Sequence, residues 1–222
     1  MCKLPDKIQP KNKTQLKRLI DYAFKHNIYD LNFIDTSKIT NMSNLFMNCE
    51  YDIDVSNWDV SNVTTTFCMF VGCKKFNSDL SNWDVSIVKN MNNMFYCCKN
   101  FDCDLSNWNV SNVTDMYSMF TACESFEGKG LDNWDVSKAE DMRFMFYNCK
   151  NFNCDLSNWD MSKALRINEM FYGCKNFEGK GLENWKLEKT LFYYDIFTGC
   201  DKVKLPSWYK AFLKRCNLEF FK

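Results

Sequence analysis

Cysteine and aspartate are the residue types of this sequence whose spacing could support chemistry. The chain has 222 residues, of which 13 are cysteines and one is a histidine, His26. Regularly spaced thiols would suit redox chemistry or metal binding. Regularly spaced carboxylates would suit cation binding or the recognition of a basic partner. The spacing of both residue types therefore needs an explanation first.

Seven cysteines each follow a phenylalanine by three residues. Zinc needs four ligands at close spacings, and a cysteine nucleophile needs a nearby histidine, and this pattern offers neither. No export signal precedes the cysteines, so we expect reduced thiols that fill the core, without catalytic residues, metal or cofactor. A thiol-based redox or metal-responsive protein is the alternative. The seven are Cys49, Cys73, Cys98, Cys123, Cys149, Cys174 and Cys200.

A polar residue directly follows each of six tryptophans and is expected to face solvent. Like charges on neighbouring strands repel each other, so a recurring aspartate has a local cost. One interpretation is a mildly acidic strip that binds a partner's basic or hydrogen-bonding groups. The other is a solvated face copied by duplication. The predicted partner-binding residues are Asp59, Asp84, Asn109, Asp135, Asp160 and Lys186.

The elements that position these residues follow from a repeat of about 25 residues. Successive tryptophans are 25 or 26 residues apart, and the phenylalanine–cysteine pairs repeat in step with them. A period in the twenties indicates a solenoid, in which each coil covers the apolar edge of its neighbour. The six tryptophans are Trp58, Trp83, Trp108, Trp134, Trp159 and Trp185.

The segment LSNWNVSNVTDMYSMFTACESF, residues 105–126, shows how one coil is expected to fold. Trp108 and Val110 are two residues apart, which is typical of a short strand. The spacing of three and four residues between Met116 and Cys123 predicts a helical turn. We therefore predict an α/β repeat solenoid. It is a stack of about seven 25-residue coils, with a parallel sheet on one face and short helices on the other.

Two coils contain an additional residue and two glycines, in the sequence FEGKGL at residues 126–131 and 177–182. We expect these segments to form corners with positive φ angles, for which glycine is suited. The motif lacks the strand, helix and spacing of a phosphate-binding P-loop.

Helices are expected to cover both ends of the array. Residues 11–26 have amphipathic helical spacing with Thr14 as the N-cap, and residues 30–35 follow as a first strand. Residues 205–216 predict a closing helix that starts at Ser207. The chain is thus a single domain with an N-terminal cap over 1–35, a solenoid over 36–205 and a C-terminal cap over 206–222.

Composition argues against several classes of protein. The 28 basic and 28 acidic residues balance, which argues against nucleic-acid binding. The sequence contains neither an apolar stretch of membrane-spanning length nor an export signal. We expect a cytoplasmic chain by default, or a surface or secreted one if a leader was removed or export does not use the Sec route. We also expect a monomer, because the caps oppose edge-to-edge pairing.

The repeated motif resembles a known family. The quoted coil, the pattern MFxxCxxF and the lead-in DLNFIDTSKITNMSNLF are similar to BspA-like leucine-rich-repeat surface proteins of bacteria, specifically the mycoplasma-type repeat domain of unknown function. The resemblance covers roughly residues 10–205, although the last coil has Lys186-Leu187-Glu188 in place of Asp-Val-Ser. It implies a leucine-rich-repeat-like solenoid without enzymatic activity, often displayed on a cell surface and used for adhesion or protein binding. We therefore expect a non-enzymatic module whose polar strand face binds a protein or glycan.

Overall fold

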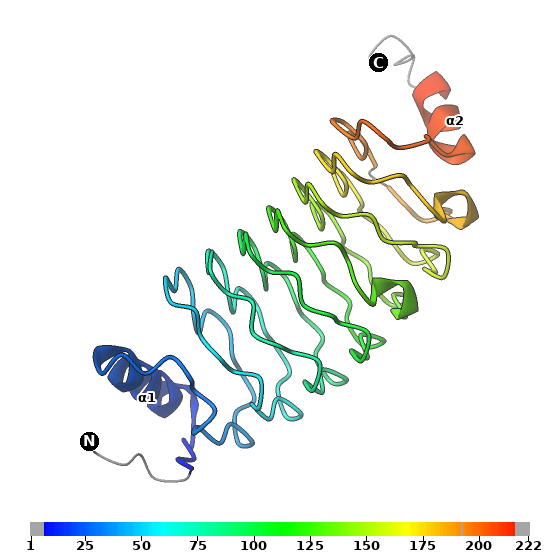
Figure 1. The fold of residues 1–222 in the computed structure, drawn as a ribbon. Coiled ribbons are helices and arrows are strands. Elements are labelled where there is room, and N and C mark those ends of the chain that lie inside the picture. Colours follow the sequence, from blue (N-terminus) through cyan, green and yellow to red (C-terminus); the bar gives the residue numbers. More distant parts are fainter. Residues whose placement is uncertain (1–6, 192, 216–222) are drawn as a thin grey trace.

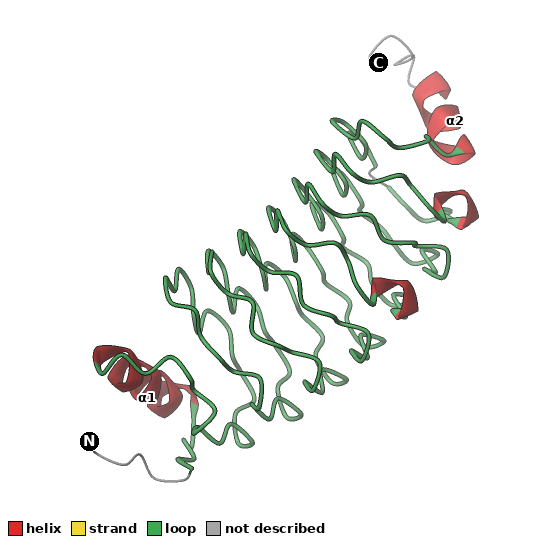
Figure 2. Cartoon of the chain, viewed as in Figure 1, coloured by secondary structure: helices red, strands yellow, loops and turns green. Residues whose placement is uncertain are grey.

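The chain forms a row of similar coils that lie one upon another, as Figure 1 shows. The computed structural model describes residues 7–191 and 193–215. Helix α1 (Lys13–Lys25) lies at the N-terminal end of the row and helix α2 (Ser207–Arg215) at the C-terminal end. Two short 3₁₀ helices, η1 (Leu131–Asn133) and η2 (Leu182–Asn184), lie at corners of coils, and loops and turns form the rest of the described residues (Figure 2).

The predicted parallel sheet is wrong, because no regular strand forms among the described residues. Trp108 and Val110 point inward and Asn109 outward, as in a strand. However, the N–H of Trp108 donates to the carbonyl of Leu105 at 3.0 Å, and that of Val113 to Val110 at 2.9 Å. These turns within the coil replace strand pairing. Isolated parallel bridges link the successive residues Asn41, Thr65, Asn90, Asp115, Asp141 and Arg166.

The predicted helical turn is also wrong. Ser118 and Ala122 have φ angles of 53° and 58°, in the left-handed region that interrupts a right-handed helix. The N–H of Ser118 donates to Arg143 of the next coil at 2.9 Å, and that of Phe120 to Met145 at 2.9 Å. Consecutive turns joined from coil to coil therefore stand where a helix was expected. We call this region the turn ladder: residues 42–49, 66–73, 91–98, 116–123, 142–149, 167–174 and 193–200.

Columns of like side chains build the core. The ladder phenylalanines stack with ring centroids 5.4 to 5.8 Å apart, from Phe46 to Phe197. The indole Nε1 of Trp108 donates to the carbonyl oxygen of Leu80 at 2.9 Å, and the other repeat tryptophans do the same. A buried indole N–H needs such an acceptor, so the column links neighbouring coils by both packing and hydrogen bonding.

Helix α2 takes the place of a further coil beneath the tryptophan column. The ring of Trp208 stacks on Trp185 at 6.3 Å, and its Nε1 donates to the carbonyl oxygen of Leu182 at 2.8 Å. Both contacts repeat those between neighbouring coils. The closing helix therefore begins at Ser207, as expected, because Trp208 must reach this position.

At the other end, α1 packs Leu16, Ile20 and Ala23 into the core. Its N-cap is Asn12, whose Oδ1 accepts from the N–H of Gln15 at 3.0 Å, so the prediction of Thr14 is wrong. The predicted strand over 30–35 is reduced to single bridges, for the same reason as in the other coils. No helix in the described part of the chain is long and apolar enough to cross a membrane.

The glycine-containing corners are as predicted. Gly130 and Gly181 have φ angles of 85° and 84° and directly precede η1 and η2. A Cβ at Gly130 would overlap the backbone of Ser106 in the preceding coil. The close approach of two coils thus requires glycine here.

Candidate binding surface

The six predicted partner-binding residues are exposed and occupy equivalent positions in successive coils. All except Lys186 close a local turn. Asp84 Oδ1 accepts from the N–H of Ser86 at 3.0 Å, and Asn109 Oδ1 accepts from that of Ser111 at 3.1 Å. The hydrogen bonds from Ser86 hold the pKa of Asp84 below its usual value. Turn closure therefore accounts for the recurring polar residue.

The ladder cysteines are buried thiols with a structural hydrogen bond. Cys123 Sγ donates to the carbonyl of Phe95 at 3.0 Å, and Cys149 Sγ donates to that of Phe120 at 2.8 Å. Burial raises the pKa of both thiols. All cysteines at described positions are free, and no group of three or more metal-ligating side chains gathers within residues 7–191 and 193–215. These thiols serve packing, as the sequence predicts.

A second surface is formed where the coils differ from one another. Tryptophan, phenylalanine and cysteine recur in nearly every coil, whereas the outward positions of the turn ladder change. Three residues before the ladder phenylalanine the chain has Ser43, Phe67, Asn92, Tyr117, Arg143, Asn168 and Tyr194. One residue after it the chain has Met47, Val71, Tyr96, Thr121, Tyr147, Tyr172 and Thr198. Because repeat geometry does not dictate these residue types, they are candidates for recognition.

Aromatic side chains gather on this surface near the middle of the array. The rings of Tyr117 and Phe144 meet edge to face at 5.6 Å, and those of Phe144 and Tyr147 at 6.0 Å. Tyr147 stacks on Tyr172 of the next coil at 4.7 Å. All four side chains are half-buried, so each keeps a surface open to solvent. We call Tyr117, Phe144, Tyr147 and Tyr172 the aromatic patch.

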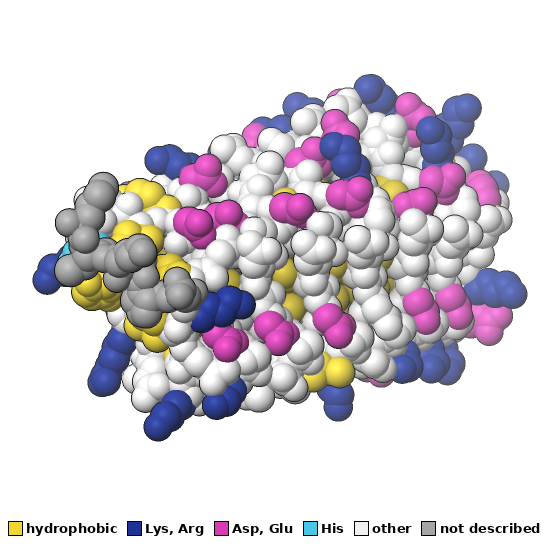
Figure 3. All heavy atoms as spheres, turned by 60° about the horizontal axis from the view of Figure 1, so that its bottom comes forward, with side chains coloured by type: hydrophobic (Ala, Val, Ile, Leu, Met, Phe, Trp, Pro, Cys, Tyr) yellow, Lys and Arg dark blue, Asp and Glu magenta, His cyan; other side chains and the backbone are white. Residues whose placement is uncertain are grey.

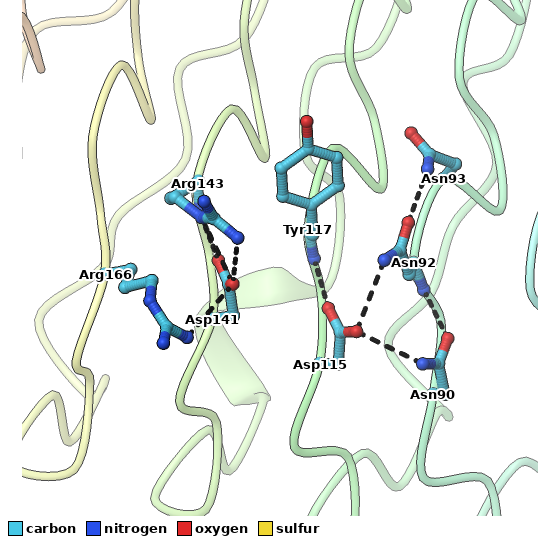
Figure 4. A network of polar contacts seen from close by, with 8 residues as sticks. All are labelled: Asn90, Asn92, Asn93, Asp115, Tyr117, Asp141, Arg143 and Arg166. Carbon is cyan, nitrogen blue, oxygen red and sulfur yellow. Dashed lines mark hydrogen bonds and ion pairs between the residues drawn. The ribbon is translucent and has the colours of Figure 1, made fainter.

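A polar network borders the aromatic patch (Figure 4). Asp141, which is 9% exposed, pairs with Arg143 at 2.6 Å and with Arg166 at 3.5 Å. The guanidinium of Arg143 also lies 5.0 Å from the ring centre of Tyr117. These contacts hold Arg143 against the patch, so that charge and aromatic surface lie side by side.

The same network continues into the preceding coil. Asp115 Oδ2 accepts from Asn90 Nδ2 at 3.1 Å and from Asn92 Nδ2 at 3.3 Å. Asp115 Oδ1 accepts from the N–H of Tyr117 at 3.0 Å. The carboxylate thereby fixes the backbone that carries the first tyrosine of the patch.

Sequence analysis missed the aromatic patch and Arg143. The detectable signal is the comparison of equivalent ladder positions, where Tyr117 and Arg143 stand at the position that is asparagine in Asn92 and Asn168. By contrast, acidic side chains on the face drawn in Figure 3 are spread along the array instead of gathering at one point.

Stacked coils of about 25 residues, closed by a helix at each end, define a repeat solenoid. The chain matches the family model described as "Mycoplasma protein of unknown function, DUF285" over residues 14–132 and 103–209, and it belongs to this family. A leucine-rich repeat protein of T. pallidum, known from a crystal structure, is similar in fold. Its TM-score is 0.52 at 16% identity, over 82% of this chain and 78% of that chain. No curated protein matches the chain.

These comparisons support the resemblance to BspA-like repeat proteins. They do so at the level of the repeat architecture, which the leucine-rich repeat protein shares.

Proposed function

We propose that this chain is a non-enzymatic repeat module that binds a partner protein through the aromatic patch and Arg143. The observation that carries the proposal is the concentration of aromatic and arginine side chains at ladder positions that differ between coils. Tyrosine and arginine are enriched among the residues that dominate binding energy at protein interfaces. The likeness to a leucine-rich repeat protein supports the repeat-module part of the proposal.

The geometry favours binding because the recognition groups are held in place before a partner arrives. The carboxylate of Asp141 fixes the guanidinium of Arg143, because it accepts two hydrogen bonds from Nε and a third from Nη2. Tyr147 and Tyr172 support one another by stacking. A partner would therefore lose little free energy to the ordering of these side chains.

The acidic strip that the sequence predicts is the second surface on which such a partner could dock. Its carboxylates already close turns, so their recurrence is explained without a partner. The two surfaces lie at different positions of the coil and can be altered separately.

The test compares two double variants of the full chain. Partner proteins captured by the immobilised wild type are identified, purified and titrated by calorimetry. Tyr147→Ser with Tyr172→Ser should weaken binding at least about tenfold, which corresponds to about 1.4 kcal/mol. Asp84→Lys with Asp135→Lys should leave the Kd unchanged. Circular dichroism confirms that both variants are folded.

The reverse result, with binding lost in the charge-reversal variant and kept in the tyrosine variant, would move the interface to the acidic strip. Saturable binding of a glycan in place of a protein would contradict the partner class. Equal binding by both variants would contradict the proposed function as a whole.

A further inference from the structure

The turn ladder has a direction that leaves its two ends chemically different. Along the ladder, alternate backbone N–H groups donate to carbonyls of the following coil. Phe146 donates to Met170 at 2.9 Å, and Phe171 donates to Ile196 at 3.1 Å. The first coil of the ladder therefore presents carbonyl groups outward, and the last coil presents N–H groups.

Helix α1 covers the carbonyl end. Lys13 Nζ donates to the carbonyl of Ser43 in the first ladder coil. Leu16 and Ile20 of the same helix are buried in the core. Figure 1 shows α1 directly against this coil. The exposed acceptors at this end thus have a cap that supplies both a donor and an apolar face.

The N–H end is covered less completely. In the preceding coil, Glu169, Phe171 and Gly173 donate to the last coil. The equivalent N–H groups of the last coil have no acceptor among the described residues. Helix α2 continues the tryptophan column, as Trp208 shows, but it supplies no acceptor to these groups within that part of the chain. The three donors belong to Asp195, Phe197 and Gly199.

An apolar pocket of about 810 Å³ adjoins these donors. It lies between the last ladder coil and α2, and its walls include Phe197, Val203, Tyr209, Phe212 and Leu213. The ring of Tyr209 meets that of Phe197 edge to face at 5.0 Å. Alternate backbone donors beside an apolar pocket are the two features by which a sheet edge binds an extended peptide.

We propose that this C-terminal ladder edge binds a peptide segment of a partner protein, which adopts the turn conformation of the ladder and adds itself as one more row of turns. The segment offers carbonyls at alternate residues to Asp195, Phe197 and Gly199. It also places an apolar side chain in the pocket beside Phe197, whose own ring Tyr209 already covers. This surface is separate from the aromatic patch, so the two proposals stand independently.

The register of such a segment can be tested because, at one ladder position, a large side chain in one coil faces a glycine in the next. Asn48 stands two residues after the ladder phenylalanine Phe46, and Gly72 holds the equivalent position in the following coil. Asn148 likewise faces Gly173. In both pairs, a Cβ on the glycine would overlap the amide oxygen of the asparagine.

Gly199 holds this same position in the last coil. Its φ of 76° is close to the 58° of Asn48 and Asn148, so asparagine fits the backbone there. The variant Gly199→Asn would therefore exclude any incoming segment that lacks glycine at the facing position.

The experiment uses the full chain and two peptides copied from its own ladder, each with serine in place of cysteine. Residues 116–126 carry Ala122 at the facing position, and residues 167–177 carry Gly173. Fluorescence anisotropy should show that the wild type binds both peptides. The Gly199→Asn variant should bind the peptide with Gly173 with unchanged affinity. It should bind the peptide with Ala122 at least tenfold more weakly than the wild type does. A glycine peptide with aspartate at the Phe171 position should bind neither protein.

Four outcomes would overturn the proposal. The first is that neither peptide binds the wild type, and the second is that Gly199→Asn affects the binding of both peptides equally. The third is that binding appears only after removal of residues 216–222, which would make the chain's own end the occupant. The fourth is a dimer in light scattering that Gly199→Asn dissociates, which would make a second copy the occupant.

Discussion

Asn148 and Gly173 form a complementary pair across neighbouring coils. The amide oxygen of Asn148 lies where a Cβ on Gly173 would have to be, and Asn48 and Gly72 repeat the arrangement. Backbone hydrogen bonds alone would allow any coil to follow any other. Side-chain volume at this position therefore adds specificity to the order in which coils stack.

The first prediction tests this pair. Gly173→Ala should lower the free energy of unfolding by about 1–3 kcal/mol, because the new Cβ overpacks the site. In an Asn148→Ala background, Gly173→Ala should lower the free energy of unfolding by at least about 1 kcal/mol less, because the side-chain amide that the new Cβ would overlap is absent. Ala122 shows that alanine adopts the required φ at the position of Asn148. Equal costs in both backgrounds, measured by urea unfolding, would contradict the steric account.

The second prediction concerns the tryptophan column. Trp108→Phe removes the indole N–H that donates to the carbonyl oxygen of Leu80, and this oxygen then keeps only its hydrogen bond from the N–H of Trp83 at 3.1 Å. The lost hydrogen bond should lower the free energy of unfolding by about 0.5–1.5 kcal/mol in chemical denaturation. Phe101→Leu is the control, because it removes ring volume from the same core without removing a hydrogen bond. If both substitutions cost the same, the hydrogen bond contributes little.

The third prediction concerns turn closure by the aspartates. Asp84→Asn should change stability by less than about 0.5 kcal/mol, because Asn109 closes the equivalent turn with its amide oxygen. Asp84→Ala should cost about 0.5–1.5 kcal/mol through the lost hydrogen bond. Urea midpoints at neutral pH distinguish the two. A destabilised asparagine variant would show that charge matters more than hydrogen bonding.

The fourth prediction is the pH dependence of stability. Hydrogen bonds from Ser86 and Ser137 lower the pKa values of Asp84 and Asp135 in the folded chain. Their stabilisation is therefore fully present above the unfolded pKa of about 3.9 and is lost as the pH falls through the folded values. Thermal unfolding should show a midpoint that falls below about pH 4. The decrease should be smaller in Asp84→Asn, and an equal decrease would contradict this assignment.

The fifth prediction concerns thiol reactivity. Cys97 is half-buried, whereas Cys123 and Cys149 are fully buried. Burial raises the pKa of all three thiols, so each reacts slowly at neutral pH. Iodoacetamide labelling followed by mass spectrometry should modify Cys97 first and the other two only on unfolding. Rapid labelling of native Cys123 would favour the alternative of a thiol-based redox protein.

The period of the coils and the identity of the core could be read from the sequence. Recurring tryptophan, phenylalanine and cysteine predict the columns, because only stacking brings identical positions together. The errors concern the backbone within each coil. The spacing between Met116 and Cys123 fits consecutive turns as well as a helix, since both return to the interior every three or four residues.

The aromatic patch could not be found from the recurring residues. Strict recurrence drew attention to the aspartates, although recurrence at Asp84 and its equivalents reflects the closure of the same turn in every coil. The aromatic patch lies where recurrence fails. Three successive coils contribute to it, so Tyr117, Phe144 and Tyr172 meet only when these coils are stacked.

The amino-acid sequence by itself thus determined the repeat, the inward-facing residues and the closing helix at Ser207, because these depend on local order and periodicity. Tertiary structure alone decided where the backbone N–H groups donate. In the turn ladder half of them bond to the next coil, as Ser118 does to Arg143, and a hydrogen bond between coils cannot form until both coils are in place. For that reason no local pattern distinguishes a ladder of turns from a helix.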